Sequence, residues 1–194
     1  MDFSPTTEEE WWNEHVVYSK LNRQRLDIST AVFRHPRPKA IVVLITGWSE
    51  TYLKYSELIR SVYERGFSVF TYDHQSQGLS GRWLAEQQST WIHSFDDYVD
   101  DFVYCVSTMA STEAPNLPLY VIAHSMGGLI ASIAMARLPG LVTRCVLTSP
   151  MFRSKAGLKV IGYRYSVKLD SSGRIYRCLR LLILLIRCWK YSRS

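Results

Sequence analysis

Residues 119–128 read LYVIAHSMGG, and this stretch decides the fold. Its first half is a short apolar run of the kind that forms a buried strand, and a predicted helix follows over 126–138. Between them stands Ser125 among small residues, as in the G-x-S-x-G pattern that presents a nucleophilic serine on a sharp turn from strand to helix. A serine in an ordinary glycine-rich turn is the alternative interpretation.

The residues around Ser125 have separate roles in such a turn. Ala123 replaces the first glycine of the pattern, and Gly127 and Gly128 leave room where the strained backbone approaches its neighbours. The backbone N–H of Met126 begins the helix and is placed to donate a hydrogen bond to an oxyanion that develops beside the serine.

A second oxyanion donor is expected from the loop after residues 41–45. This continuous β-branched run predicts a strand covered on both faces. Gly47 allows the backbone to turn close to a substrate carbonyl, and the N–H of Trp48 is the candidate donor. The alternative is a turn that only ends the strand.

Strand and helix patterns alternate along the middle of the chain, which is the signature of parallel βαβ units. We therefore expect an α/β fold with a mostly parallel sheet and helices on both faces. Residues 1–24 are expected to form an N-terminal extension, residues 25–152 the core, and residues 153–194 a separate region. The predicted strands are 28–33, 41–45, 67–72, 119–123 and 141–147, and the predicted helices are 52–65, 95–109 and 126–138.

Charge divides the chain into two unequal parts. Residues 1–152 carry 12 Lys and Arg against 16 Asp and Glu, a net charge of −4, whereas residues 153–194 carry 11 against 1, a net charge of +10. A basic tail of this kind suits an anionic membrane surface or a nucleic acid. No nucleic-acid-binding module is recognisable, so we expect no nucleic-acid partner.

No targeting signal or cofactor motif stands out. The N-terminus lacks the basic and apolar regions of a secretory signal peptide, and the apolar stretch 179–186 is far shorter than the roughly 20 residues that span a bilayer. We expect a cytoplasmic protein, with peripheral membrane contact through the basic tail as an open alternative. Neither a metal nor an organic cofactor is expected. Buried or free thiols, rather than disulfides or metal ligands, are expected at Cys105, Cys145, Cys178 and Cys188.

Five blocks in a fixed order make a family recognisable, at residues 47–55, 73–81, 95–101, 123–128 and 149–152. Together they resemble the lysophospholipase branch of the serine aminopeptidase-like α/β-hydrolases, which also contains monoacylglycerol lipases. The resemblance covers about residues 25–152. It implies hydrolysis of a glycerolipid ester, a lysophospholipid or a monoacylglycerol, by a Ser-His-Asp triad without a metal or organic cofactor.

One departure from the family lies in the second block. Such proteins usually read Asp-His-Arg-Gly-x-Gly, whereas this chain has Gln75 and Ser76 at the third and fourth positions. The change removes a cation and a flexible glycine from a loop that supports the site. We interpret Asp73 and His74 as structural members of that loop.

The larger departure concerns the catalytic base. The triad of α/β-hydrolases follows the chain order Ser, acid, His. Here the last histidine is His124, which we expect to point away from the elbow, and the only carboxylate side chain after Ser125 is Asp170. A serine hydroxyl needs a base to take its proton. Recruitment of His74 or His93 is the alternative.

Family members continue beyond this length, with a cap followed by strands and helices that deliver the acid and the base. We therefore expect the 194 residues to lack the last strands and helices of the fold, as a truncated, alternatively spliced or frame-shifted product that is inactive alone. Residues 153–194 would then be the start of the cap followed by an aberrant tail. A non-catalytic lipid-binding protein, or a membrane-surface protein that uses residues 175–189, is the alternative function.

Overall fold

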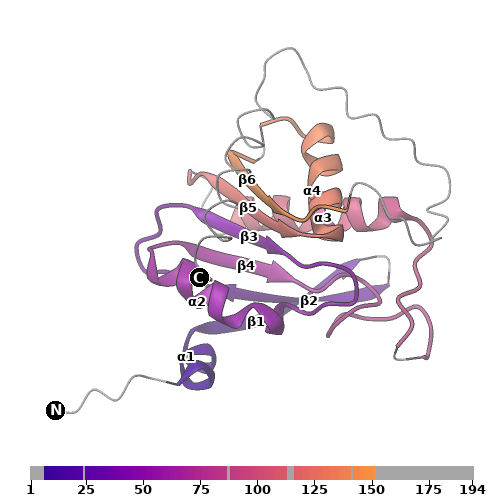
Figure 1. Cartoon of the computed structure of the whole chain (residues 1–194), viewed down its shortest axis with the longest axis horizontal. Coiled ribbons are helices and arrows are strands. Elements are labelled where there is room, and N and C mark those ends of the chain that lie inside the picture. The colour runs from indigo at the N-terminus through magenta and orange to yellow at the C-terminus, as the bar shows by residue number, and fades with distance from the viewer. Residues whose placement is uncertain (1–6, 24, 87, 113–115, 141, 152–194) are drawn as a thin grey trace, which may run out of the picture.

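The computed structural model describes residues 7–151 except 24, 87, 113–115 and 141. The predictions for the cap and the basic tail at 153–194 lie outside the described residues. The described part contains a six-stranded sheet in the order β1-β2-β4-β3-β5-β6 (Figure 1). The elements are α1 (Glu8–His15), β1 (Val16–Arg23), β2 (Leu26–Phe33), β3 (Ile41–Ile45), the 3-10 helix η1 (Tyr52–Tyr55), α2 (Ser56–Glu64), β4 (Ser68–Tyr72), α3 (Phe95–Thr112), β5 (Leu119–His124), α4 (Met126–Arg137) and β6 (Arg144–Thr148).

The strands β4, β3, β5 and β6 are parallel neighbours, as the alternating pattern predicted. The helices α2, α3 and α4 connect them in turn. All five residues of β3 are buried, because the strand is covered on both faces. The carboxyl ends of the four strands lie at one end of the sheet, which is where α/β proteins bind their ligands.

Residues 16–23 fall within the expected N-terminal extension, yet they form β1 of the same sheet. This strand pairs antiparallel with β2, which pairs antiparallel with β4. Most β1 side chains are half-buried or exposed, and Val17 and Tyr18 retain 47% and 52% of their surface. Without an apolar alternation the strand has no signal in the sequence.

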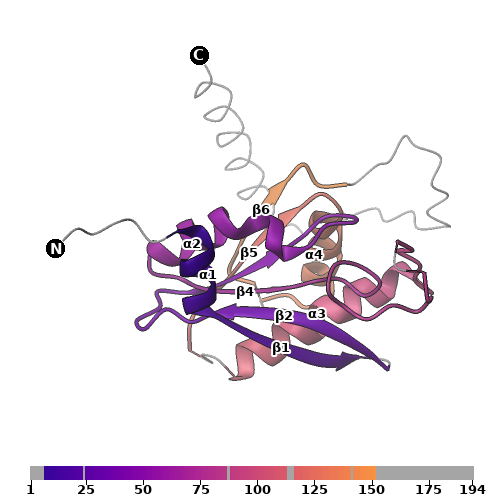
Figure 2. The ribbon, with the colours of Figure 1, turned by 90° about the horizontal axis from the view of Figure 1, so that it is seen from below.

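The helices form a layer on each face of the sheet (Figure 2). Apolar side chains of α1 and α2 pack with one face, and those of α3 and α4 pack with the other. The larger cluster lies on the α3 and α4 side, so the two helices that flank the strand β5 bury the most apolar surface.

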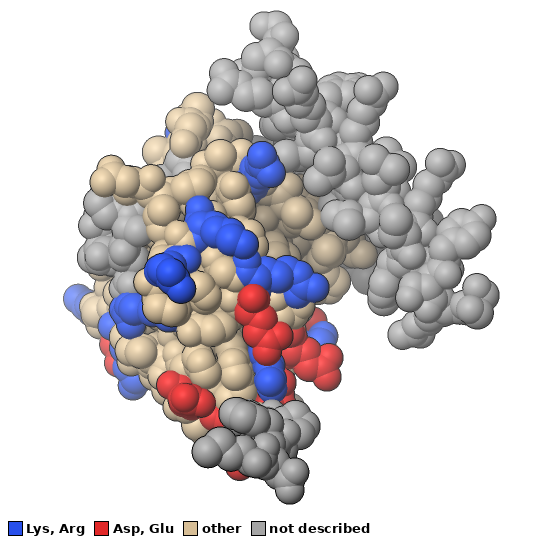
Figure 3. All heavy atoms as spheres, turned by 90° about the vertical axis from the view of Figure 1, so that its left-hand side faces the viewer, with Lys and Arg blue, Asp and Glu red and all other residues tan. Residues whose placement is uncertain are grey.

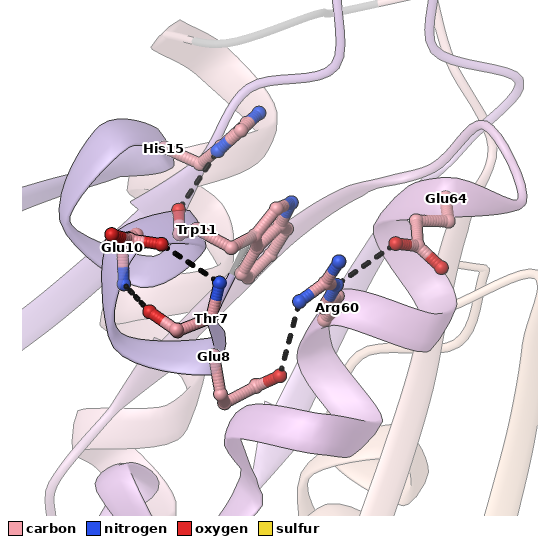
Figure 4. A network of polar contacts seen from close by, with 7 residues as sticks. All are labelled: Thr7, Glu8, Glu10, Trp11, His15, Arg60 and Glu64. Atoms are coloured by element: carbon pink, nitrogen blue, oxygen red, sulfur yellow. Dashed lines mark hydrogen bonds and ion pairs between the residues drawn. The ribbon is translucent and has the colours of Figure 1, made fainter. Parts of the chain in front are cut away.

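The helix α1 is fastened by a capping box and a buried tryptophan (Figure 4). The hydroxyl of Thr7 accepts from the N–H of Glu10, whose carboxylate accepts from the Thr7 N–H. Trp11 is buried, and the Arg60 guanidinium of α2 lies 5.6 Å from its ring centroid and donates to Glu8. The spacing of Thr7 and Glu10 is a capping-box signal for this helix start, which the prediction of a plain N-terminal extension missed.

The end of the sheet where the parallel strands begin is basic (Figure 3). The loops before β3 and β4 and the first residue of β6 supply exposed cations, and the Lys39 ammonium donates to the Arg65 carbonyl across 3.0 Å. The candidate site lies at the opposite end. The exposed cations are Arg34, Arg37, Lys39, Arg65 and Arg144.

Candidate active site

Ser125 occupies the turn between β5 and α4. Its φ of 50° and ψ of −116° are those of the first central residue of a type II′ turn, a position that favours glycine. The Ser125 N–H donates to the Thr148 carbonyl at 3.0 Å, and its carbonyl accepts from Gly128 and Met151. Contacts from the end of β6 therefore hold the serine in a conformation that it would not adopt alone.

The small residues of the elbow are needed because other parts of the chain lie against them. A Cβ at Gly127 would lie 2.4 Å from the Thr46 carbonyl oxygen, and one at Gly128 would lie 2.9 Å from Pro150 Cβ. Ala123 is fully buried. The elbow thus packs directly against the loops that follow β3 and β6.

The loop after β3 lies beside the serine. A Cβ built at Gly47 would be 3.2 Å from Ser125 Cβ. Within the part of the chain that the structure describes, the backbone amides of Trp48 and Met126 donate to no acceptor. Two unused N–H groups next to a serine hydroxyl are the donor set that an oxyanion requires.

Glu50 anchors this loop from within. Its carboxylate accepts from the Gly47 N–H at 2.7 Å, from the Tyr55 hydroxyl at 2.5 Å and from the Lys54 ammonium. Burial raises the pKa of Glu50, but the hydrogen bonds from Lys54, Tyr55 and Gly47 outweigh it and leave the pKa below its ordinary value. The ionised carboxylate therefore holds the Gly47 amide away from a substrate.

Asp73 fastens the supporting loop and is fully buried. Its oxygens accept from the Tyr52 N–H, the Thr51 hydroxyl and the Leu79 N–H at 2.8 to 2.9 Å. Burial raises the pKa of Asp73, although these hydrogen bonds lower it. The carboxylate is enclosed by its own loops, which agrees with a structural role.

His74 is also fully buried. Its Nε2 lies 3.2 Å from the Thr46 carbonyl, and its ring packs edge-on between Tyr72 and Tyr98. The Nδ1 atom has no partner in the structure as described. Burial lowers the pKa of His74 to about 4, so the ring is neutral at pH 7.

The structure does not bring any of the five histidines, all of which it describes, to within a hydrogen bond of Ser125. His124 has its Nδ1 3.0 Å from the Thr148 hydroxyl, and His93 packs edge-on against Trp83 and Trp91. Among the described residues, Ser125 therefore has the strained turn and nearby unused backbone N–H groups, but no histidine is placed to act as its base.

Gln75 of the second block shares a buried carboxylate partner with Arg23 of β1. Asp101 of α3 is fully buried and accepts from Arg23 at 3.1 Å and from the Gln75 amide at 2.7 Å. The Gln75 carbonyl accepts in turn from the Trp83 indole. Burial raises the pKa of Asp101, and the contacts with Gln75 and Arg23 oppose this shift. No local pattern in the sequence connects Arg23 with this site.

No group of three or more His, Cys, Asp and Glu side chains that could hold a metal ion occurs among the described residues. Cys105 and Cys145 are both buried. In the same part of the chain, no helix combines the length and the apolar character needed to cross a membrane.

Comparison with known protein families gives one match over most of the chain. The family described as serine aminopeptidase, S33, matches residues 36–180. Lysophospholipase L2 of Escherichia coli K12 is 38% identical over 120 residues, which are 62% of this chain and 35% of that protein. Human monoglyceride lipase is 33% identical over 114 residues, 59% of this chain and 36% of that protein. The chain thus spans about a third of the length of these curated relatives.

Solved structures give the fold. A carboxyl esterase from Bacillus coagulans superposes with a TM-score of 0.62 at 20% identity, over 69% of this chain and 44% of the esterase. Monoglyceride lipase from Saccharomyces cerevisiae superposes with a TM-score of 0.61 at 17% identity, over 70% of this chain and 45% of the lipase. The expected α/β-hydrolase fold is confirmed, and the chain covers part of it.

Proposed function

We propose, from the premise that this chain belongs to the serine aminopeptidase S33 family, that it contains the nucleophile and the oxyanion hole of a lipid-ester hydrolase. The relatives that match it are lysophospholipases and monoglyceride lipases, which supports a lysophospholipid or a monoacylglycerol as the substrate. The observation that carries the proposal is the Ser125 turn, with its positive φ and its contact with the Gly47 loop.

In the proposed reaction the Ser125 hydroxyl oxygen attacks the ester carbonyl carbon, and its proton passes to a base. The carbonyl oxygen becomes an oxyanion that accepts from the N–H groups of Trp48 and Met126. Collapse of this intermediate breaks the bond to the alcohol, which leaves with a proton, and an acyl-serine remains. Water then hydrolyses the acyl-serine and releases the fatty acid.

We propose that the 194-residue polypeptide performs this reaction poorly. All five histidines precede Ser125 in the sequence, and none is hydrogen-bonded to it in the described structure. A serine hydrolase without its base retains about 10³ to 10⁴ of rate enhancement over water, from binding and the oxyanion hole.

Hydrolysis of p-nitrophenyl butyrate tests this proposal. The wild-type polypeptide should act barely above background, and Ser125→Ala should change this rate little, because the residual rate comes from binding and the oxyanion hole. Fast turnover that Ser125→Ala abolishes would overturn the proposed weakness and point to a recruited base. His74→Ala and His93→Ala would then identify that base, because only the recruited histidine should be needed.

A non-catalytic lipid-binding protein is the second candidate, and the absence of a histidine hydrogen-bonded to Ser125 in the described structure favours it. The two candidates differ in their dependence on the hydroxyl. An alkylboronic acid forms a tetrahedral adduct with a nucleophilic serine, whereas a fatty acid binds without one. A Ser125-dependent adduct supports the hydrolase. Fatty-acid binding that Ser125→Ala leaves unchanged, without any adduct, supports the binding protein.

A further inference from the structure

The backbone N–H groups of three successive residues in the loop after β3 differ in their hydrogen-bond partners. The Gly47 N–H donates to Glu50, and the Ser49 N–H donates to the Gln77 side chain at 2.6 Å. The Trp48 N–H between them donates to no described residue. The loop is thus fastened on both sides of the one amide that is left for a substrate.

Gln77 reaches this loop from the turn after β4. Its side chain is 1% exposed, and its backbone is held by hydrogen bonds to His74 and from Ser80. The side-chain Nε2 donates to the Tyr98 hydroxyl of α3 at 2.8 Å. Gln77 therefore joins the loop beside Ser125 to the helix packed beneath the sheet.

The orientation of the Gln77 amide follows from its partners. A backbone N–H can only donate, so the atom that faces Ser49 must be the oxygen Oε1. The Nε2 group then faces Tyr98, whose hydroxyl can accept. Reversing the amide would place two donors together at Ser49 and leave a buried group unsatisfied.

The fastened residue is in a conformation that needs support. Ser49 has a φ of 54°, in the left-handed region that costs a non-glycine residue free energy. Rotation of the peptide between Trp48 and Ser49 would relieve this strain and break the bond to Gln77. The same rotation would change ψ of Trp48, so the peptide that carries the Trp48 N–H would be held only from the Gly47 side and would no longer be fixed in place.

We infer that Gln77 is a positioning residue of the oxyanion hole, which fixes the Trp48 amide by holding the next peptide. This role rests on the proposed function, because it gives the Trp48 N–H a transition state to stabilise. Gln77 acts through the peptide after Trp48 and needs no contact with the substrate.

The test uses the ¹⁵N-labelled full chain with butylboronic acid as the probe of Ser125 and the oxyanion hole. Gln77→Met keeps the length of the side chain and removes both hydrogen bonds. It should weaken the adduct about 10-fold, the effect of one lost hydrogen bond of ordinary strength. The ¹H–¹⁵N resonances of Trp48 and Ser49 should shift, and the Ser49 amide should exchange faster with solvent.

Two further variants separate positioning from general destabilisation. Gln77→Glu keeps an acceptor for the Ser49 N–H, and the Tyr98 hydroxyl can donate to the carboxylate, so this variant should stay within about 3-fold of wild-type adduct affinity. Gln88→Met is the matched control, since Gln88 is exposed on the same loop and should behave as wild type. Thermal unfolding of each variant shows whether it is folded at the temperature of the assay.

The adduct measurements distinguish failure of the role of Gln77 from failure of the proposed function. A wild-type adduct that Ser125→Ala retains would overturn the proposed function. A Ser125-dependent adduct that Gln77→Met forms as tightly as wild type would overturn the role of Gln77. If wild type forms no adduct, the proposed oxyanion hole fails. In that case, unchanged Trp48 and Ser49 resonances in Gln77→Met would also show that Gln77 does not hold the loop after β3.

Discussion

The loops at the two ends of the parallel sheet turn in different ways. Where the strands finish, each following loop contains a serine with positive φ. Where the strands begin, the positive-φ residues of the described loops are glycines, Gly66 at 89° and Gly140 at 92°. The serines are Ser49 at 54°, Ser76 at 59°, Ser125 at 50° and Ser149 at 46°.

This difference shows where the fold accepts strain. A non-glycine residue in a sparsely populated backbone region costs about 1 to 3 kcal/mol and persists only where its surroundings hold it. At the site end those surroundings are specific hydrogen bonds, from the Ser49 N–H to Gln77, from the Ser76 N–H to Gly81 and from the Ser125 N–H to Thr148. The basic end needs no such fastening, because glycine makes its turns without strain.

The largest effect on stability is expected when one glycine at each end of the parallel sheet is replaced by alanine. A Cβ at Gly78 would lie 2.0 Å from Asp73 Oδ2, whereas a Cβ at Gly140 meets nothing among the described atoms within 4 Å. Gly78→Ala should lower the free energy of unfolding by about 4 kcal/mol or more, and Gly140→Ala by about 1 to 2 kcal/mol from its positive φ alone. Urea denaturation measures both, and equal losses would contradict the asymmetry between the ends.

The second prediction concerns pH. Because burial lowers the pKa of His74 to about 4 while the unfolded chain titrates near 6.5, the folded state resists protonation. His74 therefore contributes stability above pH 6.5 that is lost as the pH falls toward 4, about 3 kcal/mol in total. The raised pKa values of Asp73 and Asp101 have the opposite effect on the pH dependence, because the stability that these groups contribute grows as the pH falls through their titration range.

Unfolding free energies from pH 7 to pH 4 check this prediction. The variant His74→Gln should show a flatter curve than wild type. His35→Gln, at the basic end where the ring is half-buried, should keep the wild-type slope. A wild-type slope in His74→Gln would contradict the assignment.

The third prediction measures the strain at the elbow. Ser125→Ala and Ser125→Gly both remove the hydroxyl, but only glycine relieves the positive φ. The glycine variant should be more stable than the alanine variant by about 1 to 2 kcal/mol. The same pair at Ser132, inside α4, should show the reverse order by about 1 kcal/mol, because alanine is the better helix former. An alanine variant at 125 as stable as the glycine variant would mean that the turn is unstrained.

The smallest effect is expected at Ser76, where the family pattern has glycine. Ser76→Gly removes the strain of φ 59° and loses only a 3.4 Å hydrogen bond from the Trp83 N–H. It should raise the free energy of unfolding by about 0.5 to 1 kcal/mol, which is about 1 to 4 °C in Tm for a chain of this size. A lower Tm would show that the serine hydroxyl contributes more to the loop than its strain costs.

Local patterns in the sequence determined the parallel part of the fold. The apolar runs predicted β3 and β5, the helical spacing predicted α2, and the small residues around Ser125 predicted the turn between β5 and α4. Each of these signals lies within a few neighbouring residues, because strand and helix periodicity and turn chemistry are properties of short segments.

Only the tertiary structure decided what fastens the loops that follow β3 and β4. Arg23 and Asp101 are 78 residues apart, and Ser49 and Gln77 are 28 residues apart. The exposed strand β1 brings the first pair together, and the side-by-side pairing of β3 and β4 brings the second. A hydrogen bond between distant residues leaves no periodic pattern in the sequence, so its partners become known only when the packed strands bring the donor and acceptor atoms together, here to 3.1 and 2.6 Å.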